Sequence, residues 1–461
     1  MASVHVIKDE IFWGRQIVPS AILNIIELHG GNEMRKREIR SWMMYDFANS
    51  AFATTMMAAV LPVFYYDVAA KNIDRSLATS YWGYSQSLAV LIVALLAPVL
   101  GAIADYSSSK KKFLRFFAYM GIVASILMAF VGEGGYLLAS ILLIFGTIGF
   151  SGSNVFYDAF LPEIAKGEEI DRISARGYAY GYIGGGILLL INLLMIMNPS
   201  WFLLPNALVA TQLSFASVGV WWFIFSLPMF KHVKEQRHSQ PSISGSYMTI
   251  GFKRLRMTFK ELNHYKQLLI FLIAFWLFND GISTIIKMAT IYGRDIGIGA
   301  NDLIAALLIT QFVGIPFAFF FGYLAKKISA KRALMIALWI YVGIVLLGYF
   351  MTTATHFYLL AMMVGFVQGG AQALSRSIFG SMVPEHRHAE FYGFFGISAK
   401  FSAIFGPFLF AFVGQITGSS RFGIVSLVVF FLAGIYLLSK VNIDKGKEQA
   451  KIVMVNEGVD V

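Results

Sequence analysis

The sequence has no cysteine among its 461 residues, which excludes disulfide bonds and thiol chemistry. Charged residues are also scarce, at 14% against roughly 25% in ordinary soluble domains. No Gly-rich loop ends in Lys-Ser or Lys-Thr, so direct use of ATP through a phosphate-binding loop is not expected. Neither a metal-ligand cluster nor a nucleophile-base arrangement is visible, and we expect no cofactor, no metal and no enzyme activity.

What the chain has in abundance is apolar residues, at 57%, with 42 Phe and 42 Gly. About 20 apolar residues in helical form cross a bilayer core. Twelve such runs occur, at 42–66, 78–104, 113–131, 136–159, 178–198, 212–231, 267–292, 302–325, 333–352, 356–380, 391–416 and 421–440. The sequence therefore predicts an all-α membrane protein with twelve transmembrane helices.

The net charge of +11 raises the question of a nucleic-acid partner, but its distribution indicates membrane topology instead. Most Lys and Arg lie in the loops that follow even-numbered runs. The other loops carry only Lys71, Arg75, Arg294 and Arg421. Because positive charge is retained on the cytoplasmic side, we predict a multi-pass protein of the cell membrane with both termini in the cytoplasm and no nucleic-acid partner.

The chain also repeats itself. Gly101-Ala-Ile-Ala-Asp105 before a basic cluster is echoed at Gly322, Leu161-Pro-Glu163 at 383–385, and Gly184 at Gly406, with offsets of 221 to 222 residues. A duplication of this kind predicts two pseudo-symmetric six-helix lobes, with a solute site between them. The predicted divisions are a tail at 1–41, lobes at 42–231 and 267–440, a linker at 232–266 and a tail at 441–461. We expect the basic linker to lie against an anionic inner leaflet.

Polar residues recur at helical spacing inside the first, fourth, seventh and tenth runs. Residues three and four apart share a helix face, so each stripe can border one aqueous space, and ionisable groups within a membrane usually mark a transport pathway. The residues predicted to bind the solute or a proton are Asp46, Asn49, Asn154, Asp280, Lys287, Gln372 and Arg376.

Each stripe also has a structural interpretation. Asp46 could cap a helix or pair with the other lobe, and Asp280 could form a purely structural ion pair with Lys287. Arg376 could grip an anionic group by a forked contact or hold a structural carboxylate. Lys400 in the eleventh run is compatible with either role.

A second set of residues is predicted to serve conformational change. The loop from Gly101 through Asp105 to Lys110, with its echo at Gly322, would allow close helix approach and face the inner leaflet. Asp158 could pair with Arg172 or Arg176 at the end of the fourth run. The glycines at Gly184–Gly186 and the pair Gly406-Pro407 are interpreted as packing or pivot positions.

Several longer motifs resemble a known family. They are Trp42-x-x-Tyr45-Asp-Phe-Ala-Asn-Ser-Ala-Phe52, Phe160-Leu-Pro-Glu-Ile-Ala165, Gly181-Tyr-Ile-Gly-Gly-Gly186, Phe278-Asn-Asp-Gly281 and Gln368-Gly-Gly-Ala-Gln-Ala-Leu-Ser-Arg-Ser377. Over residues 35–440 the chain is similar to major facilitator superfamily permeases, specifically the bacterial and archaeal relatives of the fungal autophagy vacuolar effluxer. The resemblance implies the major facilitator fold, alternating access and, by analogy with the fungal member, amino acid efflux.

The resemblance has departures. Tyr106, Ser108 and Ser109 replace the usual residues of the first loop motif, and Lys326 replaces an acidic residue in the second. The Gly-Pro expected in the fifth run stands in the eleventh. We therefore predict a monomeric secondary transporter of a small polar solute, with proton coupling as a hypothesis. The alternative is a non-transporting receptor or assembly factor on the same scaffold.

Overall fold

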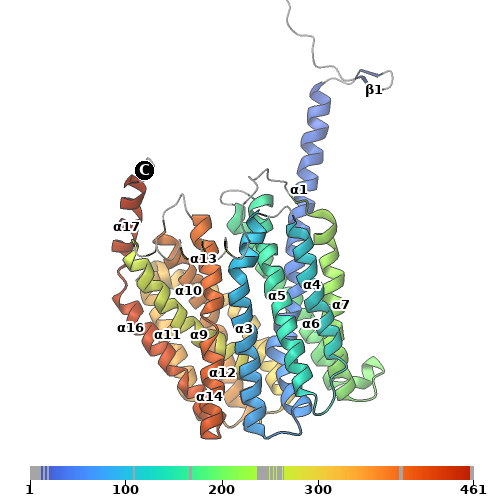
Figure 1. Cartoon of the computed structure of the whole chain (residues 1–461), viewed down its shortest axis with the longest axis vertical. Helices are drawn as coiled ribbons and strands as arrows, with labels where there is room; N and C mark the ends of the chain where they lie inside the picture. Colours follow the sequence, from blue (N-terminus) through green and yellow to red (C-terminus); the bar gives the residue numbers. More distant parts are fainter. Residues whose placement is uncertain are drawn as a thin grey trace, which may run out of the picture.

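The computed structural model describes residues 12–13, 16–17, 20–106, 109–165, 169–235, 249, 253, 256, 262, 264–383 and 388–456. It is a bundle of long helices in which the two halves of the chain lie side by side (Figure 1). The N-terminal half comprises α1 (Ser20–Ala51), η1 (Phe52–Ala59), α2 (Val60–Phe64), η2 (Tyr65–Ala69), α3 (Arg75–Tyr106), α4 (Lys110–Met128), α5 (Tyr136–Ile164), α6 (Glu169–Met197), η3 (Pro199–Phe202) and α7 (Ala207–His232).

The C-terminal half comprises α9 (Lys266–Asp295), α10 (Ala300–Ile328), α11 (Ala330–Tyr349), α12 (Ala354–Ser381), α13 (His388–Phe401), α14 (Phe405–Thr417), α15 (Ser420–Ser426), α16 (Val428–Lys440) and α17 (Ile443–Asn456). Outside the bundle, β1 (Phe12–Trp13) and β2 (Gln16–Ile17) form a small antiparallel hairpin. Most of the predicted linker, 236–248 in particular, lies outside the described residues.

Every apolar run found in the sequence coincides with helical structure, and the all-helical membrane fold is confirmed. Among the described residues, ten helical stretches are long and apolar enough to cross a membrane. The runs at 113–131 and 302–325 are the two that do not qualify. The first becomes α4, whose opening turn carries three lysines, and the second becomes α10, with a shorter apolar stretch at Ala300–Gly314. The count of twelve spans therefore stays a prediction.

The first predicted run is more irregular than its composition suggests. Its helix begins at Ser20, so it includes half of the segment predicted as a tail, and α1 projects beyond the other helices in Figure 1. Within the run, η1 and η2 are π-helical. A π-helical turn widens the helix and is frequently found at functional sites.

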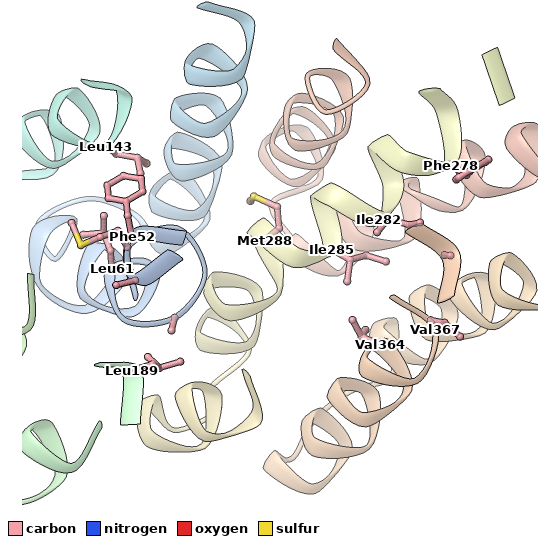
Figure 2. Close-up of a cluster of buried hydrophobic side chains, with 14 of the residues drawn as sticks. Phe52, Leu61, Leu143, Leu189, Phe278, Ile282, Ile285, Met288, Val364 and Val367 are labelled. Carbon is pink, nitrogen blue, oxygen red and sulfur yellow. The ribbon is translucent and has the colours of Figure 1, made fainter. Parts of the chain in front are cut away.

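The helices are packed by apolar side chains from both halves, and one contiguous buried cluster extends through the bundle. Figure 2 shows Phe52 beside Leu143 in the N-terminal half, and Ile282 and Ile285 opposite Val364 in the C-terminal half. Without a hydrophobic force between helices in lipid, close packing of small residues carries much of the stability. The face of α6 fits this principle, because a Cβ added at Gly184 would overlap the backbone of α1. Gly184 thus lies at a close contact between α6 and α1, and whether it is also a pivot stays a prediction.

At the ends predicted to face the cytoplasm, lysines tie the helices together in a pattern that the two halves share. Lys111 Nζ donates to the carbonyl of Val233, just past α7, at 2.7 Å, and Lys331 Nζ donates to the carbonyl of Val441, just past α16, at 2.6 Å. Lys110 Nζ pairs with Glu163 Oε1 at 2.5 Å. Two motifs that were noticed separately in the sequence, the basic loop and Leu161-Pro-Glu163, therefore contact one another.

The glycines of the repeated loop motif do not behave as predicted. Close helix approach was expected at Gly101 and Gly322, but an added Cβ at either position would have no neighbour within 4 Å. Both lie near the same ends of their helices, α3 and α10, and among the described residues no atom comes within 4 Å of the added Cβ. The side chain of Asp105 lies outside the described residues.

The Lys110–Glu163 pair gives a test of this arrangement. Its side chains are only 13% and 7% exposed, so Glu163→Gln leaves a poorly solvated ammonium and is expected to cost about 3 kcal/mol. The matched control is Lys71–Glu133, whose side chains are 50% and 56% exposed at 2.8 Å. Glu133→Gln should cost less than about 1 kcal/mol. Thermal unfolding of the detergent-solubilised variants measures the difference, and equal losses would contradict the assignment.

Candidate functional site

The polar stripes of the first and fourth predicted runs face one another. Asn49 on α1 is buried, and its Nδ2 donates to Asn154 Oδ1 on α5 at 2.6 Å. Asp46, one turn earlier, is half-buried and accepts a long contact of 3.5 Å from Ser50 Oγ. The structure thus brings together three of the residues predicted to bind a solute or proton.

Charged side chains from both halves of the chain lie around this cluster. Asp158 on α5 lies within electrostatic range of Asp46, and also of Lys400 on α13 and Arg376 on α12. Asp158 and Arg376 are exposed, and each lies within the last two turns of its helix. Asp158 of the N-terminal half therefore lies within electrostatic range of two cations of the C-terminal half and of Asp46, and we call these four groups the opposing charges.

This arrangement changes two assignments made from the sequence. Asp158 was expected to pair with Arg172 or Arg176, but no ion pair within 4.0 Å joins it to Arg176, and the side chain of Arg172 is not described. Lys400 was left without a role and now belongs with the opposing charges. The only sequence signal for Lys400 was a lysine in the middle of an apolar run, which is costly unless it is hydrated or paired.

Asp280 and Lys287 do not form the ion pair predicted for them, since no contact within 4.0 Å joins their charged groups. Asp280 is 2% exposed, and its Oδ1 instead accepts the backbone N–H of Gly406 at 2.8 Å. A Cβ at Gly406 would collide with Thr284 Oγ1, so this glycine is required by close contact with α9. Lys287 contributes its carbonyl, which accepts from Trp82 Nε1 at 3.2 Å.

The remaining predicted residues are placed as follows. Gln372 on α12 is exposed, one turn before Arg376 and on the same helix face. Arg176 is exposed near the start of α6. Pro407 is buried, and its carbonyl approaches the Cα of Gly83 so closely that an added Cβ would lie 3.0 Å away.

Hydrogen bonds and one ion pair join the two halves of the chain, and they lie from the middle of the helices to the ends that carry the predicted external loops. Arg294 Nε donates to Asp67 Oδ1 at 2.7 Å, and Tyr66 donates to Asp295 Oδ1 at 2.8 Å. The others run from Thr290 to Ala58 O, Trp82 to Lys287 O, Ser80 to Ala411 O, Tyr84 to Gln415, Ser76 to Gly414 O and Ser87 to Ile404 O.

We call this set of contacts the external seam. It was not foreseen from the sequence, because its partners lie more than 200 residues apart and many of the acceptors are backbone carbonyls. The seam closes one end of the interface between the halves, while the opposing charges lie on the other side of it. Asp158 and Arg376 lie near the ends of α5 and α12 that are predicted to face the cytoplasm.

Comparisons with known proteins bear on the family and the fold of the chain. The family described as "Vacuole effluxer Atg22 like" matches residues 34–451. The uncharacterized MFS-type transporter YxiO of Bacillus subtilis is 40% identical over 407 residues, covering 87% of this chain and 94% of that protein. Autophagy-related protein 22 of Kluyveromyces lactis is 23% identical, covering 91% and 96%. A crystal structure of the nucleoside transporter NupG superimposes with a TM-score of 0.62 at 14% identity, covering 88% and 98%.

The external seam makes a prediction about access. Ser80 is buried and bonded across the seam, so Ser80→Cys should react slowly with a membrane-impermeant maleimide added on the side of loop 70–74. Removing the ion pair by Asp67→Asn or Arg294→Gln weakens the seam, and labelling should become several-fold faster. The control is Glu133→Gln, which breaks a pair within one half. Equal labelling rates in all backgrounds would contradict a closing role for the ion pair.

Proposed function

Because the chain belongs to the Atg22-like vacuole effluxer family and is a multi-pass transporter of the major facilitator type, we propose that it moves a small polar solute by alternating access. In this proposal the protein has twelve spans in two six-helix lobes, with both termini in the cytoplasm. It acts as a monomer in the cell membrane. The observation that carries the proposal is the placement of Asp158, which has Asp46 of its own half and Arg376 and Lys400 of the other half within electrostatic range.

The solute that suits this site carries both a positive and a negative group. Arg376 and Lys400 would hold a carboxylate, the former with a planar fork of donors. Asp46 and Asp158 would hold an ammonium, with Asn49, Asn154 and Gln372 available for neutral polar contacts. An amino acid has both groups on one carbon. The family description names an effluxer, and we propose amino acid efflux as the activity.

Alternating access supplies the mechanism. The external seam is closed in this structure, so the opposing charges would be open to the cytoplasm. A solute bridging the two halves would replace the hydration of their charges and favour closure of the cytoplasmic side. Opening of the seam would then release the solute outside. A ligand shifts such an equilibrium only by the difference of its affinities for the two states.

Proton coupling is part of the proposal. Titratable carboxylates inside a membrane protein are the usual carriers of protons along a transport path. Asp46, Asp158 and Asp280 all lie within transmembrane helices of this chain. We propose that proton movement drives the solute, with Asp46 and Asp158 at the site itself.

A solute panel tests the proposal as a whole. Purified protein is screened for thermal stabilisation by each of the proteinogenic L-amino acids and by sugars and nucleosides, and solutes that stabilise it are then tested for flux in proteoliposomes. We expect stabilisation and flux with one or more amino acids. Absence of both with every solute would favour the alternative of a receptor or assembly factor.

The opposing charges make a sharper prediction. With a stabilising amino acid, Asp158→Asn and Arg376→Gln should each lower kcat/KM for flux at least about tenfold, as expected for loss of one charge-assisted contact. Lys400→Gln should do the same. Lys327→Gln is the matched control, because Lys327 is exposed at the end of α10 and lies over the ring of Tyr323. Unchanged flux in the three site variants would remove these residues from the solute site.

Proton coupling has its own readout. Addition of a transported amino acid to lightly buffered proteoliposomes should change the internal pH, and an imposed pH gradient should accelerate flux. Asp46→Asn should abolish the pH change while leaving exchange of labelled for unlabelled solute, which needs no net proton movement. A pH change of normal size in Asp46→Asn, Asp158→Asn and Asp280→Asn alike would exclude these carboxylates as carriers.

A further inference from the structure

The eleventh predicted run is two helices rather than one. It was expected to span 391–416 continuously, but α13 ends at Phe401 and α14 begins at Phe405, so residues 402–404 are not helical. A broken helix leaves backbone N–H and C=O groups without helical partners, and lipid provides none. Some of these groups keep local partners, since Ser402 N–H donates to the Ser398 carbonyl, and two neighbouring helices bind the residues around the break.

One neighbour is α9, which holds both sides of the break with consecutive residues. Asn279 Nδ2 donates to Ser402 Oγ at 2.6 Å, just past the end of α13. Asp280 Oδ1 accepts the N–H of Gly406 at 2.8 Å, in the first turn of α14. A carboxylate at a helix N-terminus satisfies free N–H groups and interacts favourably with the helix dipole.

The contact between α9 and α14 leaves little space. An added Cβ at Gly406 would collide with Thr284 Oγ1 and approach Asp280 Oδ1 to 2.7 Å. The end of α13 has the opposite polarity, and Lys400 lies in its last turn, where a cation is favourable. Each half-helix therefore presents its dipole end to a side chain of the appropriate charge.

The second neighbour is α3, from the other half of the chain. The carbonyl of Ile404, the residue that precedes α14, accepts from Ser87 Oγ at 2.8 Å. Along α14, the carbonyls of Ala411 and Gly414 accept from α3 side chains, and Gln415 accepts from Tyr84. Much of the external seam is thus carried by α14.

We propose that residues 402–404 are a hinge within the membrane and that Asp280 sets its angle by capping α14. In this inference Asp280 is a positioning residue and not a solute ligand. Its charge holds α14 on α9 in the orientation in which α14 meets α3 and closes the external seam. Loss of the cap frees α14 to tilt, and the seam opens. The inference concerns the conformational step and requires no knowledge of the solute.

The experiment measures the opening of the seam directly, in the absence of solute. The chain has no native cysteine, so spin labels can be attached at Leu203→Cys and Phe350→Cys, which are 95% and 70% exposed in the loops after α6 and α11. The protein is placed in lipid nanodiscs, and the distance distribution between the labels is recorded by pulsed electron resonance. The test variants are Asp280→Asn, Asp280→Ala and Gly406→Ala.

We expect each test variant to raise the ratio of long to short distances between the two labels. The increase should be about five- to thirtyfold for Asp280→Ala. It should be smaller for Asp280→Asn, whose amide oxygen still accepts a backbone N–H. Gly406→Ala should shift the ratio in the same direction because it forces α14 away from the carboxylate. The double variant Gly406→Ala with Thr284→Ala should recover part of the original distribution, since the colliding oxygen is gone.

Two matched variants serve as controls. The first is Gly396→Ala in α13, where an added Cβ has no described neighbour within 4 Å. The second is Asp302→Asn, which changes a carboxylate of the same half; this carboxylate accepts a hydrogen bond from Tyr358 at 2.8 Å. Both should leave the distribution unchanged. The inference is overturned if Asp280→Ala and Gly406→Ala leave it unchanged, or if the controls shift it equally. Failure of every solute to be transported would defeat the proposed function but not this result.

Discussion

The need to satisfy polar groups without help from lipid governs this structure. A backbone N–H or a carboxylate that faces hydrocarbon costs several kcal/mol, so the polar groups at the helix break have partners and the charges of the site border solvent. At the break between α13 and α14, α9 supplies an acceptor for a free N–H of α14, and α3 adds a hydrogen bond to the carbonyl of Ile404. The charges of Asp158 and Arg376 are tolerated because their side chains are exposed. Polar groups that have hydrogen-bond partners within the protein therefore belong to structural parts of the molecule, whereas the exposed charges belong to the proposed solute site.

The fold could be predicted from the sequence to a large extent, because a membrane helix is recognised by about 20 consecutive, mostly apolar residues. Polar stripes on the first and fourth runs predicted that Asn49 and Asn154 share a face of their lobe, and the two side chains are hydrogen-bonded. This prediction was possible because residues three and four apart lie on the same face of a helix. The π-helical turns of η1 were missed because no Pro or Gly occurs inside that segment. The break at 402–404 was also missed, although the nearby pair Gly406-Pro407 was interpreted as a packing or pivot position.

Pairings between the halves could not be predicted in the same way. Asp280 was assigned to Lys287 because the two lie seven residues apart on one helix, but the carboxylate binds the backbone of α14, 126 residues away. The ion pair of Asp67 with Arg294 joins two segments whose sequences contain no hint of one another. Such contacts depend on how the halves are oriented, which changes during alternating access and is not encoded in periodicity. For the same reason, the proximity of Lys400 and Asp158 in the proposed site could not be predicted from the sequence and became visible only in the structure.

The π-helical segment η1 has a consequence for the evolution of this fold. A π turn holds one more residue than an α turn of the same height, so a single-residue insertion into a regular helix produces it and a single deletion removes it. Since each residue of an α-helix turns by about 100°, such a deletion would rotate Asp46 and Asn49 relative to Ala58, whose carbonyl binds Thr290. Relatives without the insertion should show a one-residue gap between positions 52 and 59 and a different set of side chains facing the second half.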